Sequence, residues 1–99
     1  MLAFGTAKAA TFKGQLVDTE RQIAERQQRV QQITQEQNRL RDNMKTVAQN
    51  SDYYQRLLKK LNEQETTIEK LQGESDELRK QLDKQREDLE RALQNMNVG

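Results

Sequence analysis

The residue types that carry most enzyme and metal chemistry are absent from this sequence or scattered along it. It contains no His and no Cys, so it offers neither a thiolate nucleophile nor an imidazole base or metal ligand. Its Asp and Glu residues fall among Lys and Arg at spacings of three and four, which place opposite charges side by side on a helix surface. Carboxylates in that setting are solvated and do not converge on a water-excluded site. We predict a protein that is not an enzyme, with no cofactor and no metal site.

A group of residues near the middle of the chain is better suited to recognising a partner. Basic side chains gather there with few acidic ones between them, and they are Arg39, Arg41, Lys45, Arg56, Lys59 and Lys60. The whole chain has 17 basic and 16 acidic residues and a net charge of +1, so no overall field draws it to nucleic acid or to an anionic membrane. The local cluster is therefore the electrostatic feature that singles out a region.

The composition predicts helices rather than a large globular core. Only 32% of the 99 residues are hydrophobic, and there is no Pro, so the chain cannot bury a sizeable core. Its abundant Gln, Glu, Lys, Arg and Leu lose little rotamer freedom in a helix. No apolar run approaches the roughly 18 to 20 residues that a bilayer-spanning helix needs. We predict an all-α protein, and its cellular compartment stays open.

Two series of positions, spaced alternately by three and four residues, predict a coiled coil. The first series is Ala9, Phe12, Leu16, Thr19, Ile23, Arg26, Val30, Ile33, Gln37, Leu40, Met44 and Val47. The second series is Tyr54, Leu57, Leu61, Gln64, Ile68, Leu71, Ser75, Leu78, Leu82, Gln85, Leu89, Ala92 and Met96. The heptad phase breaks at Asn50 and Ser51, which disfavours a single continuous helix. Asn50 tolerates the left-handed conformation that ends helices, and Ser51 or Asp52 can cap the next one.

Folding the chain back at this break brings the two series into register. The layers include Val47 with Tyr54, Met44 with Leu57, Leu40 with Leu61, Gln37 with Gln64, Ile33 with Ile68, and Arg26 with Ser75. Apolar residues meet apolar ones in most layers, and polar interruptions meet each other. We therefore predict two long helices forming an antiparallel coiled-coil hairpin, with the turn near Asn50–Asp52. Two unbroken helices paired antiparallel as a homodimer would form the same layers, so that alternative stays open.

The expected elements follow from the two series. They are a frayed or helical lead-in over 1–14, a first helix over about 9–48, a second helix over about 52–96, and a coiled-coil hairpin over 15–96. We interpret Gln37 and Gln64 as an amide pair that locks the register, because mispairing against Leu would leave buried polar groups unsatisfied. Arg26 is expected to extend its guanidinium to water, and Arg29 to lie near Glu74 at the edge of the pair.

Two stretches around the expected turn, EQNRLRDNM over 36–44 and SDYYQRLLKKLNEQETTIEKL over 51–71, also resemble a known family. They are similar to a motif of large bacterial proteins described as mucoidy-inhibitor-A-like, which have no established activity. The matching positions are Gln37, Arg39, Arg41, Asn43, Met44, Arg56, Lys60, Leu61, Gln64, Glu65, Glu69 and Leu71. The outer arms match only as coiled coil, and Leu57 stands where that family has an aromatic residue. The resemblance implies a helical hairpin excised from a larger protein with β-rich domains.

The expected function is structural: a coiled-coil module for protein–protein interaction. The candidate interaction tip consists of Arg39, Asn43, Tyr53, Arg56 and Lys60, which lie off the seam near the turn. A local alternative is that Arg39 or Asn43 hydrogen-bonds the turn carbonyls.

Self-association is the second expectation about partners. Leu58, Leu93, Ala24 and Ala48 widen the apolar stripe, so a dimer of hairpins is expected. A nucleic-acid-binding helical arm with a basic tip is the alternative function, although the neutral chain makes nucleic acid the weaker partner.

Overall fold

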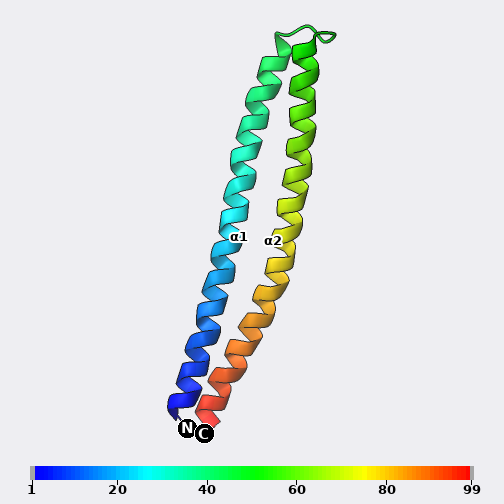
Figure 1. The fold of residues 1–99 in the computed structure, drawn as a ribbon. Coiled ribbons are helices and arrows are strands. Elements are labelled where there is room, and N and C mark those ends of the chain that lie inside the picture. The colour runs from blue at the N-terminus through cyan, green and yellow to red at the C-terminus, as the bar shows by residue number, and fades with distance from the viewer. Residues whose placement is uncertain (1, 99) are drawn as a thin grey trace. The chain divides into compact units, whose positions relative to one another are not determined.

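The computed structural model describes residues 2–98, with the side chains of 8–96. Two helices account for nearly all of this range: α1, Leu2–Lys45, and α2, Asp52–Val98. They pack against each other as an all-α helical hairpin joined by a turn over 46–51 (Figure 1). The described part of the chain contains no strand. The predicted fold class is confirmed.

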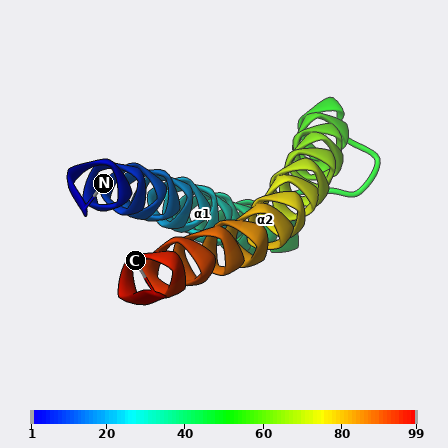
Figure 2. The same ribbon diagram turned by 90° about the horizontal axis from the view of Figure 1, so that it is seen from below.

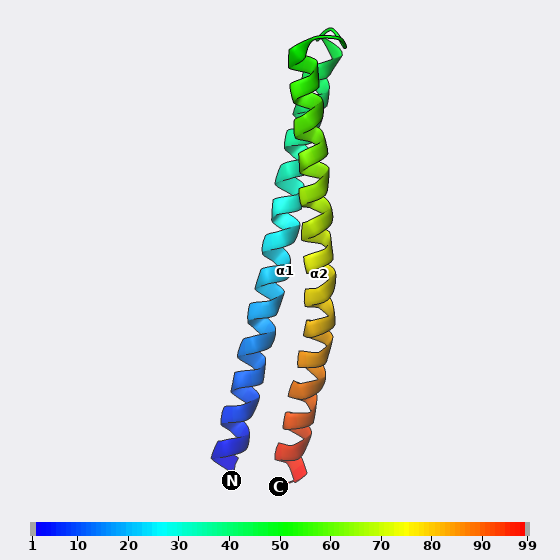
Figure 3. The same ribbon diagram turned by 45° about the vertical axis from the view of Figure 1, so that its right-hand side comes forward.

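The hairpin divides into two compact units. Unit 1 comprises the described residues of Met1–Glu25 and Ser75–Gly99, and unit 2 comprises Arg26–Glu74. In unit 2 the neighbouring parts of α1 and α2 lie side by side in the views of Figure 1 and Figure 3, and the connecting turn belongs to this unit. Figure 2 shows the same turn, in green, from below. The candidate interaction tip lies wholly in unit 2.

The seam predicted from the heptad spacing is the buried line of both units. Every a and d residue of the two series is buried or half-buried. The apolar core of unit 2 at the turn end consists of Leu40, Leu57 and Leu61, each 7–8% exposed, with Met44 packed against them. Burying a leucine side chain is worth about 1.5–3 kcal/mol, so this cluster stabilises the closed end of the hairpin.

Thr19 is the most deeply buried polar residue of unit 1. It is 1% exposed, and its hydroxyl donates to the Gln15 carbonyl at 3.0 Å and accepts from Gln81 Nε2 at 3.4 Å. Both hydrogen-bonding roles of the hydroxyl are thereby used, which removes most of the cost of burying it.

Helix α1 ends earlier than the sequence predicts, at Lys45 rather than near 48. Its backbone tightens there, because Thr46 N donates to the Asn43 carbonyl at 3.4 Å and Val47 N to that of Met44 at 3.3 Å. These three-residue spacings satisfy carbonyls that a longer α-helix would have bonded. Among residues 2–98 no residue has a positive φ, so the expected left-handed end at Asn50 is not used.

Helix α2 begins where the sequence predicts, and Ser51 caps it. Ser51 Oγ accepts the Tyr54 amide at 3.1 Å, and the Ser51 carbonyl accepts the amide of Gln55 at 3.2 Å. The same hydroxyl donates to the Ala48 carbonyl at 2.7 Å. One side chain therefore closes the turn on one side and opens α2 on the other.

Replacing Ser51 by Ala is expected to destabilise the hairpin by about 1 kcal/mol, because an orphan helix donor loses its acceptor. Urea unfolding followed by circular dichroism measures the change. Ser51→Thr is the matched control, since Thr keeps a hydroxyl that can accept the Tyr54 amide and donate to the Ala48 carbonyl, and it is expected to keep most of the stability. Equal unfolding midpoints for wild type and Ser51→Ala would show that the cap contributes nothing.

Candidate interaction surface at the turn end

The seam of unit 2 has two flanks, which are distinguished by the pairs that cross them. The Lys60 flank carries the ion pairs of Lys60 Nζ with Glu36 Oε1, at 3.0 Å, and of Arg26 Nε with Glu74 Oε2, at 2.8 Å. The Glu65 flank carries the contacts of Glu65 Oε1 described next. Each flank thus joins α1 to α2 through side chains outside the apolar layers.

On the Glu65 flank one carboxylate oxygen serves two residues of α1. Gln37 Nε2 donates to Glu65 Oε1 at 3.0 Å, and Arg41 Nη2 lies 3.7 Å from the same atom. The side chains of Arg41 and Glu65 are both 51% exposed, so their ion pair is worth at most about 1 kcal/mol. The Gln37 hydrogen bond is better shielded, because Gln37 is 2% exposed.

The predicted amide pair between Gln37 and Gln64 is therefore wrong. The Gln37 amide donates to a carboxylate, and a charged acceptor makes a stronger hydrogen bond than an amide oxygen. Gln64 Oε1 is consequently left buried without a hydrogen-bond partner among the described residues. This layer still favours one register of the two helices, but Glu65 makes the specifying contact in place of the predicted Gln64, its neighbour in sequence.

A second predicted contact is also replaced. Glu74 pairs with Arg26 rather than with Arg29. Arg26 occupies a seam position, and its side chain is only 28% exposed. Its guanidinium reaches the flank and binds the Glu74 carboxylate, whereas the sequence predicted that it would extend to water. The carboxylate that receives it is part of the Lys60 flank.

All five candidate tip residues lie on or beside the Lys60 flank. Tyr53 precedes Lys60 by one heptad, and Asn43 follows Glu36 by one heptad, so both share the side of the helix that faces this flank. Arg39 and Arg56 each lie three residues beyond Glu36 and Tyr53 respectively, which places them at its outer edge. The structure therefore brings these residues to one face of unit 2, near the turn.

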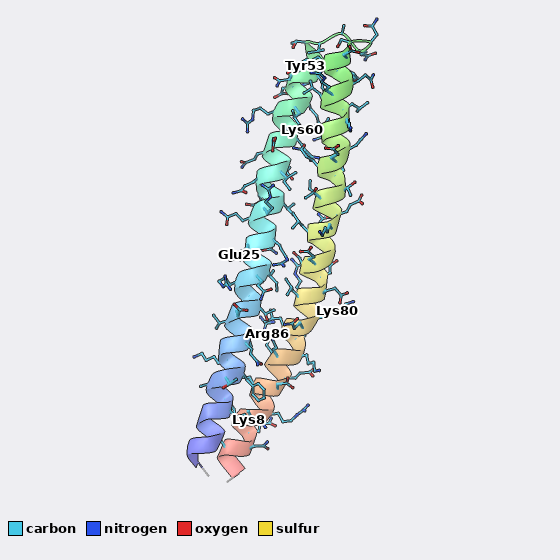
Figure 4. The ribbon with its side chains drawn as sticks, in the orientation of Figure 1. Lys8, Glu25, Tyr53, Lys60, Lys80 and Arg86 are labelled. Atoms are coloured by element: carbon cyan, nitrogen blue, oxygen red, sulfur yellow. The ribbon has the colours of Figure 1, made fainter. Side chains whose placement is uncertain are left out.

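The five residues differ in what they already contact. Lys60 is held by Glu36, and the Asn43 carbonyl accepts from Thr46 Oγ1 at 3.1 Å. Tyr53 is 51% exposed, and Figure 4 shows it at the turn end of α2. Arg39 and Arg56 are exposed and have no ion pair within the described side chains. The turn is held by Thr46 and Ser51, so the alternative in which Arg39 bonds the turn carbonyls finds no such contact.

Other ion pairs of the described side chains join neighbouring residues of one helix. Lys45 pairs with Asp42 at 3.2 Å. In unit 1, hydrogen bonds from Arg21 and Gln22 lower the pKa of Asp18. No group of three or more potential metal ligands occurs among the described residues, and no described helix is long and apolar enough to cross a membrane. Several acidic side chains, among them Asp18, Asp42 and Asp76, act as partners of neighbouring cations.

The cross-helix ion pairs of Glu36 with Lys60 and of Arg41 with Glu65 were not predicted from the sequence. Both could have been found, because the fold-back register that aligns the seam also aligns the flanking positions of the two helices. Which of several neighbouring carboxylates a cation or an amide binds, by contrast, depends on how far the side chains extend.

Comparison with known protein families, with curated proteins and with solved structures found no match for this chain.

Lys60→Gln is expected to lower the melting temperature at neutral pH, because it removes the partner of Glu36. The hydrogen bond from Lys60 is the largest cause that lowers the pKa of Glu36 below its ordinary 4.5. A depressed pKa in the folded state stabilises the fold above 4.5, and this contribution is lost as the pH falls through the folded-state value.

The gap in melting temperature between wild type and Lys60→Gln should therefore close as the pH falls below 4.5. Thermal unfolding followed by circular dichroism from neutral to acidic pH measures it. Lys59→Gln is the matched control, since Lys59 is exposed on the same helix turn, and is expected to give no pH-dependent gap. A gap that persists at strongly acidic pH would contradict the assignment.

Proposed function

We propose that this chain is a structural coiled-coil module that acts by protein–protein interaction, with its two helices antiparallel within one chain. The cross-helix contacts of unit 2 support the orientation: Arg26, Gln37 and Arg41 ascend α1, whereas their partners lie in reverse order, from Glu74 to Glu65. The resemblance to mucoidy-inhibitor-A-like proteins belongs to the same proposal, in which the hairpin is the arm of a larger protein.

One observation carries the proposal: the apolar seam joins α1 to α2, whereas an exposed aromatic ring and two exposed arginines lie outside the seam at the turn end. Tyr53, Arg39 and Arg56 share one face, are exposed, and lie outside the apolar core cluster at the turn end. Tyrosine and arginine are enriched among the side chains that dominate binding energy at protein interfaces. A protein partner that seats on this face is the function that they support best.

The alternative is a nucleic-acid-binding arm with a basic tip. Arg39, Arg56 and Lys59 favour it, since they are exposed cations near the turn. The remaining cations of the cluster weigh against it, because Arg41, Lys45 and Lys60 are each engaged with a carboxylate. The cluster available to phosphate is accordingly smaller than the sequence suggests.

The antiparallel orientation within one chain has a direct test. With Leu40→Cys and Leu61→Cys together, oxidation at high dilution is expected to give an internal crosslink at the mass of a single chain, because both residues belong to one buried cluster. Non-reducing mass spectrometry reads the result. Leu40→Cys alone is the control and can form only linked pairs of chains. A double variant that links only between chains would favour the extended homodimer.

The interaction face is tested by placing a photoreactive residue at Tyr53 in the natural host. It should crosslink to a protein, and Arg39→Gln with Arg56→Gln should reduce the yield at least roughly tenfold, as for loss of binding hot spots. The melting temperature should change little, because neither arginine has an ion pair within the described side chains and Arg39 lowers the pKa of Glu36 less than Lys60 does.

A photoreactive residue at Leu93, which is 45% exposed in unit 1, is the positional control. Equal crosslinking at Leu93 would contradict the proposal. So would a crosslinking yield at Tyr53 that is unchanged when Arg39→Gln and Arg56→Gln are combined. Crosslinks to RNA or DNA that fall steeply with salt would support the alternative, because phosphate contacts release counterions.

A further inference from the structure

The two flanks of unit 2 are covered to different degrees. On the Lys60 flank, Glu36 and Glu74 are half-buried under their ion pairs. On the Glu65 flank, the Arg41–Glu65 contact is longer, at 3.7 Å, and both side chains are exposed. The Glu65 flank is therefore the more open side of the seam.

The same flank also carries an apolar side chain that the hairpin does not need. Leu58 precedes Glu65 by one heptad in α2, so it lies on the Glu65 flank, and Ala48 lies in the turn between α1 and α2. Both are exposed, Leu58 by 37%. Half-buried seam residues lie behind them, including Val47 and Tyr54. A two-helix hairpin leaves such a seam partly uncovered, and a second pair of helices covers it.

We propose that a second copy of this chain docks on the Glu65 flank of unit 2, so that α1 of each copy lies against α2 of the other. This inference rests on the proposed function as an interaction module and names one of its partners. The contact is isologous, since the same residues of both copies take part in it. It leaves the face of Tyr53, Arg39 and Arg56 on the opposite flank free for another protein.

Charge complementarity is the reason for assigning a second copy rather than an unrelated helix. On this flank α1 presents the cations Arg41 and Lys45, which make exposed ion pairs with Glu65 and Asp42 of their own chain, whereas α2 presents the anions Glu65 and Glu69. In a dimer with two-fold symmetry, the cationic α1 of each copy faces the anionic α2 of the other copy. In a dimer that paired α1 with α1 and α2 with α2, like charges would face each other.

The layers along the flank match in the same way. Within the hairpin the register that aligns Arg41 with Glu65 also aligns Thr34 with Gln72. When α1 of one copy meets α2 of the other at the same height, the charged layer and the polar layer repeat between the copies. Leu58, one heptad from Glu65 toward the turn, supplies the apolar layer at that end.

Sedimentation equilibrium across the micromolar range tests the state of the wild-type chain, which is expected to be dimeric. Leu58→Lys should weaken the dimer at least about tenfold by burying a charge in the apolar layer. Tyr53→Lys is the matched control, since Tyr53 is an exposed apolar residue at the same end but on the other flank. A monomer at all concentrations, or equal weakening by Tyr53→Lys, would overturn the inference.

Arg41→Glu and Glu65→Arg separate a contact between copies from the contact within one chain. Each variant alone should dissociate, because like charges then meet in every pairing. An equimolar mixture should form heterodimers, detected by native mass spectrometry, since each copy restores the charge that the other lacks. A mixture that stays monomeric while the wild type dimerises would overturn the pairing. Neither result depends on the Tyr53 crosslinks. The dimer contact on the Glu65 flank and the proposed partner face at Tyr53 can therefore each be contradicted without the other.

Discussion

The seam between α1 and α2 is a single line of side chains, and the rest of the molecule depends on keeping both halves of that line face to face. Each layer has only the residues of two helices to exclude water, so burial is complete at Leu40, Leu57 and Leu61 but partial at Met44. With so little apolar area in each layer, a shift of register would cost the hairpin much of its stability. Polar contacts that specify the register therefore carry unusual weight here.

Those contacts come from the flanks, and they share a physical logic. At two layers of unit 2 a polar seam residue turns its hydrogen-bonding group sideways to a carboxylate at the edge: Gln37 to Glu65, and Arg26 to Glu74. A carboxylate there keeps part of its hydration while accepting the hydrogen bond, so Gln37 is satisfied and the charge of Arg26 is paired without burying the carboxylate. The apolar layers of the seam thus stay mostly free of water. The contacts that specify the register lie at the flanks, where the cost of desolvating polar groups is low.

The sequence predicted the part of this structure that depends on periodicity. The heptad spacing identified every seam position and the start of α2, because burial on a helix repeats with the helix turn and Ser51 is a strong cap. It did not predict the end of α1 at Lys45, where the backbone tightens through Thr46 and Val47. Nor did it predict which acceptor Gln37 takes, since neighbouring acceptors one residue apart differ in charge and reach but not in heptad pattern.

The same division explains why the sequence could propose the candidate surface only as a set of positions off the seam. Positions off the seam are free of the packing constraint, so spacing alone cannot distinguish a side chain that closes the hairpin from one that is available to a partner. The structure separates them by contact: Lys60 belongs with Glu36, whereas Tyr53 stays half exposed beside Arg56. Because the seam itself is already occupied, any partner must be recognised through the flanks and the turn. The two flanks of unit 2 differ in charge pattern and apolar content, so one hairpin can offer each of two partners a different surface.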